Sequence, residues 1–283
     1  MTTALPPPGD PDTLTVVDLT GYVFRAYYAL PPMSTRAGEP THAVLGVTRM
    51  LQRLVAEREP AMLAVALDAP GPSFRKAIDP QYKATRRAHP EDLDAQMARV
   101  QEIVEAYGVP VLVRSGLEAD DLIAALVARA RAASLKVVVV SADKDLLQLV
   151  GDDVVVLDPS NGRVLGPDET FDKLGVRPDQ VVDYLALTGD TSDNVPGVPS
   201  VGPKTAAKLL AEHGDLDSLY AALDGVARKA LRGKLEAHRD DAFRSRRLVS
   251  LRHDAEVPFD PDALRFGGAD EDRLRALPDP RIR

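Results

Sequence analysis

The sequence predicts an α/β fold, with a mostly parallel central sheet flanked by helices and followed by a small helical domain. Short valine- and leucine-rich runs alternate with amphipathic helical segments in the first part of the chain, which favours a parallel sheet. From residue 179 onward the apolar residues follow mostly helical spacing. A length of 283 residues with 45% hydrophobic content suits one large or two modest domains.

The apolar runs predict the individual elements in order. Strands and helices alternate over residues 14–18, 42–57, 62–67, 93–107, 111–113, 118–132 and 136–140. Two further strands, at 154–157 and 163–165, flank Asn161-Gly162, which is a strong signal for a hairpin turn. A helix at 181–187 leads into a loop. Residues 1–13 are rich in Pro, Gly and Asp, and we expect them to form a disordered tail.

Nine acidic residues stand at predicted strand ends, at helix starts and in the loop after 181–187. They are Asp18, Asp68, Glu118, Asp120, Asp121, Asp143, Asp145, Asp190 and Asp193. A single Asp after a strand is usually a turn or capping residue, and the acids at 118–121 also suit a helix N-terminus. Four acids after strands favour a common ligand site over four separate capping roles, because ligands bind at the carboxyl ends of parallel strands. Asp143 and Asp145 share a side if their segment stays extended.

Carboxylates that converge from separate segments repel one another unless cations lie between them. An oxygen-only cluster suits Mg²⁺ or Mn²⁺, and its commonest use is phosphoryl transfer on two metal ions. A structural Ca²⁺ loop is not indicated, because the sequence has no Asp-x-Asp-x-Asp-Gly stretch. The acidic set therefore predicts a divalent-metal site.

The charge distribution is compatible with a phosphate-rich partner. The net charge of −8 becomes +1 when the nine carboxylates are set aside. Residues 73–89 contain five Lys/Arg against one Asp/Glu, and residues 225–252 contain nine against three. Such clusters form the electrostatic footprint of a phosphate-binding surface, although either run alone is more simply read as a solvated helix face.

Other features limit the class of protein. There is no cysteine, which excludes disulfides and cysteine-based zinc sites. No apolar run approaches the length of a membrane span and the first residues do not resemble a signal peptide, so we expect a cytoplasmic protein without a membrane partner.

Residues 189–206 predict a tight hairpin between two helices. Gly197 and Gly202 permit the turn, and Pro203 suits the first position of the second helix. The free N–H groups of that helix start form a phosphate site, to which Lys204 adds charge. The stretch is not a nucleotide P-loop, because the preceding strand and the Gly-x-x-x-x-Gly spacing are missing.

Several ordered stretches, spread from about residue 16 to about residue 260, carry a family resemblance. They are Val17-Asp18, Leu67-Asp68-Ala69, Ser73-Phe74-Arg75, Tyr82-Lys83-Ala84, Glu118-Ala119-Asp120-Asp121, Ala142-Asp143-Lys144-Asp145, the 190–197 loop and Val201-Gly202-Pro203-Lys204-Thr205-Ala206. Together they resemble the structure-specific 5′-nuclease (flap endonuclease) family, including the 5′–3′ exonuclease domain of bacterial DNA polymerase I. Ordered motifs over most of a chain are far more specific than any one motif alone.

The resemblance implies an α/β nuclease domain at 14–177 with a helical arch near 71–94. A helical domain with a helix–three-turn–helix follows at 178–265, and a C-terminal tail at 266–283. It also implies two divalent ions. By position, the carboxylates that resemble the ligands of the first ion are Asp18, Asp68, Glu118 and Asp120. Those that resemble the ligands of the second ion are Asp143, Asp145, Asp190 and Asp193, and Asp121 is expected to support both.

The resemblance also assigns the basic and aromatic residues. Arg75 and Lys83 resemble catalytic arch cations that steer and polarise the scissile phosphate, and Tyr82 resembles a residue on which a nucleobase stacks. Arg86 and Arg87 are expected to contact DNA. The expected clamp on the duplex backbone, which in this family often holds a K⁺ ion, comprises Gly197, Gly202, Lys204 and Thr205.

The function that the resemblance implies is hydrolysis of DNA at a free 5′ end, nick or flap in replication and repair. A DNA polymerase and a ligase are expected in the same pathway. Two alternatives stay open: a ribonuclease on a related acidic core, and a non-catalytic binder of DNA junctions. The hairpin and the basic segment argue against the first, and the presence of all nine acids argues against the second. No polymerase segment follows within the 283 residues, and both a free-standing nuclease and a shortened one are compatible with this.

Overall fold

A single mixed sheet organises the first part of the chain. The computed structural model describes residues 4–86 and 89–276, and these residues form six strands in the order β3-β2-β1-β4-β5-β6. The strands are β1 (Thr13–Asp18), β2 (Met62–Ala66), β3 (Val111–Leu112), β4 (Lys136–Val140), β5 (Val154–Leu157) and β6 (Val164–Leu165). Neighbouring strands are parallel except β5 and β6, which pair antiparallel around the predicted Asn161-Gly162 turn.

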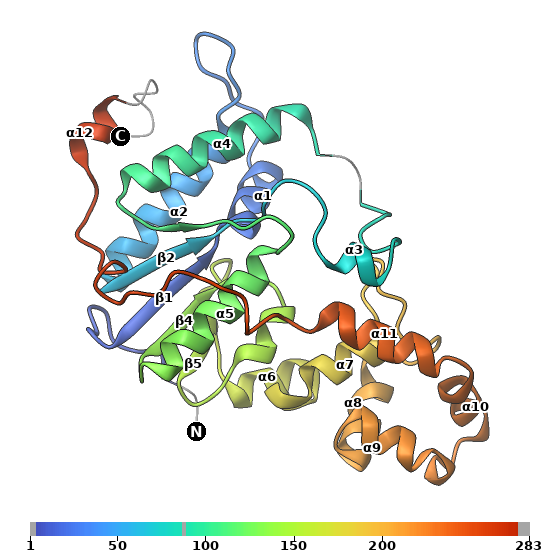
Figure 1. The fold of residues 1–283 in the computed structure, drawn as a ribbon. Helices are drawn as coiled ribbons and strands as arrows, with labels where there is room; N and C mark the ends of the chain where they lie inside the picture. Colours follow the sequence, from blue (N-terminus) through green and yellow to red (C-terminus); the bar gives the residue numbers. More distant parts are fainter. Residues whose placement is uncertain (1–3, 87–88, 277–283) are drawn as a thin grey trace.

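Helices cover both faces of the sheet, which explains the almost fully apolar strands. The helices of this part are α1 (Leu19–Ala29), α2 (His42–Arg58), α4 (Glu91–Ala106), α5 (Ala119–Ala132) and α6 (Pro167–Leu174). On β4, Val138 and Val140 pack with the cluster of α1, α2 and α4, whereas Val137 and Val139 pack with the cluster of α5. Figure 1 shows α2 and α4 together on one side of the strands and α5 on the other.

The strand order reverses between β1 and β4. Chain connections lead from β1 outward to β2 and β3, and then back past β1 to β4 and β5. In parallel sheets this switch point leaves a crevice at the carboxyl ends of the two central strands. Asp18 is the last residue of β1, and Asp143 follows the end of β4, so the fold directs both acids to this crevice.

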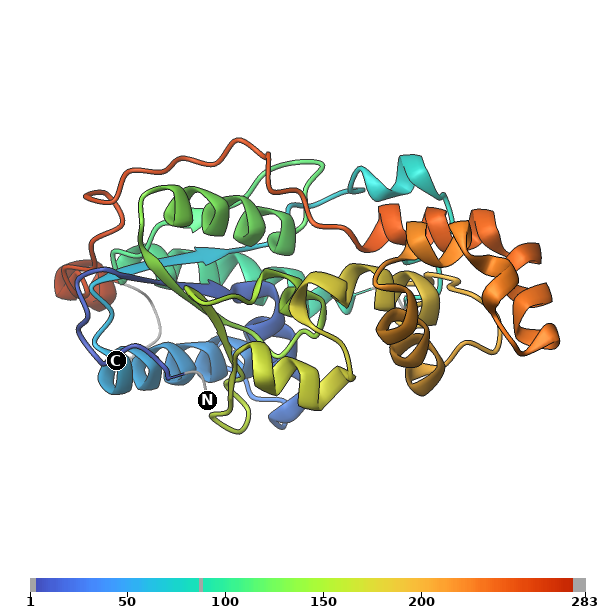
Figure 2. The same ribbon diagram turned by 90° about the horizontal axis from the view of Figure 1, so that it is seen from below.

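The helical part lies to one side of the sheet (Figure 2). Its helices are α7 (Val181–Thr188), α8 (Pro203–His213), α9 (Leu216–Ala221), α10 (Lys229–Ala237) and α11 (Arg239–Val249), with two 3₁₀ turns, η2 (Pro178–Gln180) and η3 (Leu223–Gly225). Buried Leu185 and Leu210 belong to the same apolar cluster as Leu146, which follows β4. The two parts therefore share one continuous core.

The segment after α11 returns to the sheet. Leu63 of β2 donates its N–H to the carbonyl of Leu264 at 2.9 Å, and Phe266 donates to Ala61 at 3.0 Å. Helix α12 (Glu271–Ala276) then lies beside α4. No helix within residues 4–86 and 89–276 combines the length and the apolar character that crossing a membrane requires.

The structure differs from the sequence prediction in four segments. Residues 4–12 were expected to be a disordered tail, but Gly9 donates its N–H to the Arg58 carbonyl at 3.1 Å and Asp10 pairs with Lys136 at 3.1 Å. The Pro, Gly and Asp residues that suggested disorder instead form turns, and these contacts hold the turns against the rest of the protein. The helices α1 and α6 were not predicted. Within the predicted arch at 71–94, the described residues before α4 contain one short helix, α3 (Arg75–Ile78), and residues 87–88 lie outside the description.

Candidate metal centre and nucleic-acid interface

Asp18 is held at the switch point by the start of α1. Its carboxylate accepts a hydrogen bond from the Gly21 N–H at 2.8 Å, which makes Asp18 the N-cap of the helix. The Ser141 hydroxyl, which follows β4, donates to its other oxygen at 2.9 Å. A Cβ at Gly21 would overlap this carboxylate, so the glycine leaves the space that Asp18 occupies. Capping is therefore a real role of Asp18, and it also fixes the acid between β1 and β4.

Asp68 joins β2 to the start of α5. Its carboxylate accepts a hydrogen bond from the Ala119 N–H at 2.6 Å, and its own N–H donates to the Thr20 hydroxyl at 2.8 Å. These two bonds bring the ends of β1 and β2 and the N-terminus of α5 together. Asp120, in the first turn of α5, is thereby placed beside the strand-end acids.

Five carboxylates act on one another in this crevice, and we call them the acidic group: Asp18, Asp68, Asp120, Asp143 and Asp145. Burial, together with the charges of Asp143 and Asp68, raises the pKa of Asp18 to about 6, although the hydrogen bonds from Gly21 and Ser141 act to lower it. Burial and the charge of Asp143 raise the pKa of Asp145 to about 7. Burial and the charges of the other four members hold the pKa of Asp120 well above its usual range. Mutual repulsion of this kind is what a bound cation relieves.

Asp143 and Asp145 reach the acidic group through a turn, which corrects the expectation of an extended segment. The Asp143 carboxylate accepts the Asp145 N–H at 2.9 Å, and Asp145 begins the 3₁₀ helix η1 (Asp145–Leu149). The turn brings the two carboxylates close enough for the charge of Asp143 to raise the pKa of Asp145.

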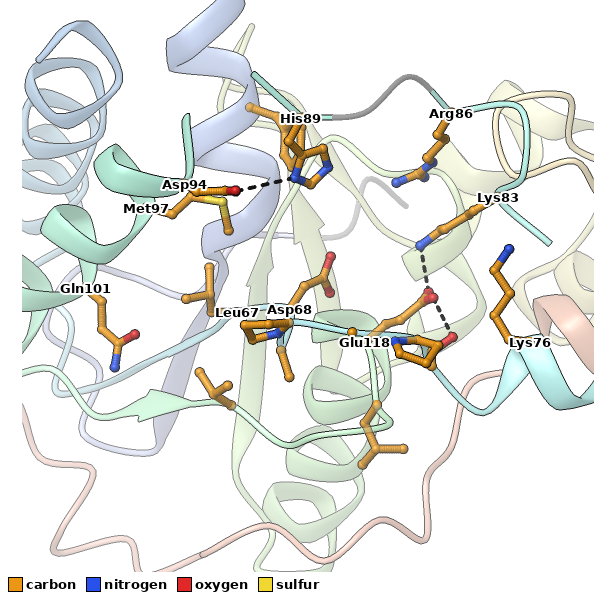
Figure 3. A pocket seen from close by; sticks show the side chains of 18 of the residues that line it. Leu67, Asp68, Lys76, Lys83, Arg86, His89, Asp94, Met97, Gln101 and Glu118 are labelled. Carbon is orange, nitrogen blue, oxygen red and sulfur yellow. Dashed lines mark hydrogen bonds and ion pairs between the residues drawn. The ribbon is translucent and has the colours of Figure 1, made fainter. Parts of the chain in front are cut away.

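Glu118 and Asp193, two further predicted ligands, are paired with cations of the 71–94 segment. Glu118 lies 2.9 Å from the Lys83 ammonium and accepts the Ser73 hydroxyl at 2.8 Å. Burial acts to raise the pKa of Glu118, but Lys83 and Arg75 outweigh burial and hold it below its usual value. Asp193 forms an ion pair with Arg86, and Figure 3 shows Lys83 and Arg86 extending from the same stretch of chain toward this region.

Tyr82 is buried between these two acids. Its hydroxyl lies 3.0 Å from carboxylate oxygens of both Glu118 and Asp193, and the residue is only 4% exposed. The structure contradicts the expectation that this ring offers a stacking surface, because protein atoms already cover it. Tyr82 instead links the start of α5 to the loop after α7.

Asp190, the remaining predicted ligand of the second ion, is paired with a lysine. Lys144 lies between two acids. Its Nζ is 3.0 Å from the carboxylate of Asp145, and it also forms an ion pair with Asp190. Burial acts to raise the pKa of Asp190, but hydrogen bonds from Lys144 and Ser192 lower it to about 2. Lys144 was not predicted as a site residue. Its position between two acids in Asp143-Lys144-Asp145 was the only signal that could have indicated it.

Arg75 and Asp121 form a buried ion pair that corrects two expectations. Arg75 is 2% exposed and Asp121 is fully buried, with guanidinium–carboxylate distances of 2.6 and 2.9 Å. Arg75 also donates to the Leu248 carbonyl at 2.6 Å, and Asp121 accepts the Glu118 N–H at 3.1 Å. Arg75 therefore does not face a substrate phosphate, and Asp121 is neutralised by Arg75 and caps α5 rather than supporting metal ions.

The predicted hairpin between α7 and α8 is present. Asp190 and Val195 exchange backbone hydrogen bonds at 2.9 and 2.7 Å across the loop. Gly197 has a φ of +59°, and a Cβ there would overlap the backbone nitrogen of Gly189. Gly197 is thus required by the close approach of two backbone segments, which agrees with its predicted place in the tight turn, while its place in a DNA clamp stays a prediction.

The start of α8 is open to solvent. Gly202 precedes Pro203, and a Cβ at Gly202 would meet no protein atom within 4 Å, so packing does not require glycine there. Lys204 is exposed and Thr205 is partly exposed. Lys234 of α10 reaches Ser200 of the hairpin and adds a basic residue that the motif did not indicate. Arg87, expected to contact DNA, lies outside the described residues.

A cavity of about 720 Å³ opens next to Asp68 and Glu118. Leu67, Met97 and Val113 contribute an apolar lining, whereas Lys83 and Arg86 lie on the side of the 71–94 segment. Figure 3 shows the labelled side chains gathered around this space, with Met97 and Gln101 coming from α4. An apolar lining with a basic side is compatible with part of a nucleotide chain.

The donor set fits a hard divalent cation by its chemistry, since it consists of carboxylate oxygens and the pKa values of Asp18, Asp120 and Asp145 are raised. Within the described ranges, however, no three His, Asp or Glu side chains are arranged to hold a metal ion. Lys144, Lys83 and Arg86 instead neutralise Asp190, Glu118 and Asp193. Side-chain rearrangement would therefore have to accompany metal binding.

Comparisons with known proteins extend over nearly the whole chain. Residues 13–175 match the family model described as 5′-3′ exonuclease, N-terminal resolvase-like domain, and residues 176–272 match 5′-3′ exonuclease, C-terminal SAM fold. A protein of Aquifex aeolicus named 5′-3′ exonuclease is 38% identical, over 93% of this chain and 90% of that protein. DNA polymerase I of Pseudomonas aeruginosa is 41% identical over 93% of this chain. The matched region covers only 30% of the length of that polymerase.

A solved structure shares the fold. It is a bacteriophage T5 flap endonuclease in complex with DNA and metal ions, with a TM-score of 0.71 and 22% identity, covering 85% of this chain and 89% of that one. This likeness agrees with the mostly parallel sheet and the attached helical part described above. The two family matches and the Aquifex relative show that the chain belongs to the 5′–3′ exonuclease family of nucleases.

Proposed function

We propose that this protein is a divalent-metal-dependent 5′–3′ exonuclease and flap endonuclease. It hydrolyses DNA phosphodiester bonds at 5′ ends, nicks and flap junctions during replication and repair in the cytoplasm. The observation that carries the proposal is the acidic group at the switch point, where burial and mutual repulsion raise the pKa values of Asp120 and Asp145, next to the basic 71–94 segment. DNA bound to the T5 enzyme and the name of the Aquifex relative support the same reaction.

Two Mg²⁺ or Mn²⁺ ions would be held by the strand-end acids and their neighbours. One ion would take Asp18, Asp68, Glu118 and Asp120, and the other Asp143, Asp145, Asp190 and Asp193. Bound at these positions, the ions would supply an activated water and charge stabilisation for hydrolysis of the phosphodiester. The metal ions named for T5 enzymes of this fold support a metal site here.

The basic residues of the 71–94 segment would position the scissile phosphate. Lys83 is 2.9 Å from Glu118 and also lines the cavity, so its ammonium can exchange this carboxylate for a phosphate oxygen when DNA enters. Arg86, paired with Asp193, is exposed enough to make the same exchange. These contacts would place the strand without reading its sequence.

The hairpin would hold the duplex next to the cut. The free N–H groups at the start of α8, together with Lys204 and Thr205, form an anion site on an exposed surface. The open space at Gly202 allows a phosphate backbone to approach closely, and main-chain oxygens of the hairpin would hold a K⁺ ion. We accordingly assign residues 14–177 to the nuclease domain, 178–265 to the duplex-binding domain and 266–283 to a C-terminal tail.

The direct test uses labelled 5′-flap, nicked and blunt DNA, with matching RNA strands, incubated with and without Mg²⁺. We expect cleavage of flap and nicked DNA only with the metal, and no cleavage by Asp120→Asn. Faster cleavage of RNA would favour the ribonuclease alternative, and tight binding without cleavage would favour a non-catalytic binder. Products with ligatable nicks would place a DNA polymerase and a ligase in the same pathway.

The route of the 5′ strand can be tested separately. If the strand passes under the 71–94 segment, a bulky adduct attached to the 5′ end before mixing should block cleavage. The same adduct added after binding should block much less, because the strand has already passed. Equal single-turnover rates for both substrates would show that this segment is only a clamp.

A further inference from the structure

Lys144 connects the two parts of the chain within the metal-ligand region. It belongs to the loop after β4, and it bridges Asp145 of the same loop and Asp190 of the loop after α7. The side chains of Asp145 and Asp190 are 18% and 9% exposed, whereas that of Lys144 is 39% exposed. The two carboxylates are thus largely buried, while the side chain of the lysine that joins them has a path to solvent.

No other cationic side chain among the described residues pairs with these two acids. Asp190 otherwise accepts hydrogen bonds from Ser192 and from the N–H of Asp193, and the Asp145 N–H binds Asp143. A single charge therefore neutralises two converging carboxylates in the protein without metal. A divalent ion between the same oxygens would meet a positive charge at hydrogen-bond distance, which costs several kcal/mol even at the moderate effective dielectric of such sites.

We infer that Lys144 is a tethered cation that occupies the second metal position, so that a metal ion binds Asp145 and Asp190 only when Lys144 swings out. This inference rests on the proposed metal-dependent function. Its consequence is that Lys144 keeps the two acids paired, and the two parts of the chain joined, in the protein without metal. A second consequence is that Lys144 weakens the affinity for the second ion, because a metal ion can bind at that position only after Lys144 has moved away.

The test measures metal binding in the DNA-free protein. Mn²⁺ is titrated into the full chain at constant ionic strength, and free Mn²⁺ is followed by electron paramagnetic resonance. Lys144→Met removes the charge and keeps an unbranched side chain only one atom shorter, and we expect it to tighten the weaker Mn²⁺ site by at least about tenfold. Lys144→Arg keeps the charge and should bind like the wild type. Lys136→Met is the matched control, because Lys136 pairs with Asp10 at 3.1 Å at the other end of β4.

A second measurement uses the wild-type protein and is independent of how the variants fold. Lysines are methylated with formaldehyde and borohydride, with and without Mg²⁺, and each site is quantified by mass spectrometry. Because its ion pairs with Asp145 and Asp190 hold the Lys144 ammonium, we expect Lys144 to be methylated slowly without metal and to lose this protection when Mg²⁺ is present, while Lys136 is unchanged.

The outcomes separate this inference from the proposed function. The inference alone would be overturned if Lys144→Met bound Mn²⁺ at both sites with the same affinities as the wild type. Protection of Lys144 that Mg²⁺ does not alter would overturn it as well. The absence of Mn²⁺ binding in both proteins would overturn the metal-dependent function as well. Binding at the weaker site by Lys144→Met, where the wild type shows none, would support the inference strongly.

Discussion

Asp145→Asn should stabilise the protein in the absence of metal and abolish its cleavage of DNA. Burial, followed by the charge of Asp143, raises the pKa of Asp145 from 3.8 to about 7. One pKa unit corresponds to about 1.4 kcal/mol, so the full shift corresponds to roughly 4 kcal/mol of unfavourable free energy at neutral pH. Asparagine has nearly the same shape without the charge. We therefore expect the variant to recover about 2 to 4 kcal/mol of unfolding free energy.

The pH dependence fixes the sign of this effect. The raised pKa means that between pH 4 and pH 7 the folded protein binds more protons than the unfolded chain, so its stability falls as the pH rises through this window. The asparagine variant lacks this contribution. The difference in unfolding free energy between Asp145→Asn and wild type should be near zero below pH 4, should widen as the pH rises, and should level off above pH 7.

Urea denaturation of the metal-free protein over this pH range measures the difference directly, and thermal melts should shift by about 2 to 4 °C per kcal/mol. Asp152→Asn, at an exposed aspartate before β5, is the matched control that makes the same substitution outside the acidic group. Added Mg²⁺ should stabilise the wild type more than the variant. A variant less stable than the wild type at neutral pH, or a difference that stays constant with pH, would refute the argument that repulsion dominates at Asp145.

Three further results are expected. Arg75→Met should lower the unfolding free energy by about 3 to 5 kcal/mol, since it leaves a fully buried aspartate unpaired; a loss below about 1 kcal/mol in urea would contradict this. Gly197→Ala should lower the melting temperature clearly, because Gly197 has a φ of +59°. Gly202→Ala should leave the melting temperature unchanged, because the space around its Cβ is open, but it should weaken duplex binding. Equal melting shifts for the two variants would refute the distinction. Lys204→Ala should reduce the salt slope of duplex binding by about one unit, while Lys83→Ala should lower the single-turnover rate more than the affinity; matching effects in both assays would argue against separate roles.

Much of the fold was predictable because its signals are local. A continuous valine-rich run such as 136–140 predicts a strand that is buried on both faces. Asn161-Gly162 predicts a tight hairpin, because these residue types readily adopt the backbone conformation that the turn needs. Acids at the end of β1 and just beyond the end of β2 meet at one sheet edge whatever the details of packing, because parallel strands end on the same side. The positions of Asp18 and Asp68 in the site follow from this rule alone.

The roles of individual side chains depended on contacts between distant segments. Arg75 pairs with Asp121 and reaches the Leu248 carbonyl, which is 173 positions away, and Lys144 reaches Asp190 across 46 positions. A motif specifies that a cation is present, but not which carboxylate lies nearest once the helical part packs against the sheet. The sequence by itself determined the sheet, the acids at its edge and the hairpin, since these follow from local periodicity and strand direction. Only the tertiary structure decided which charges are buried in pairs and which stay accessible, because desolvation and ion pairing depend on the packing of segments that the sequence places far apart.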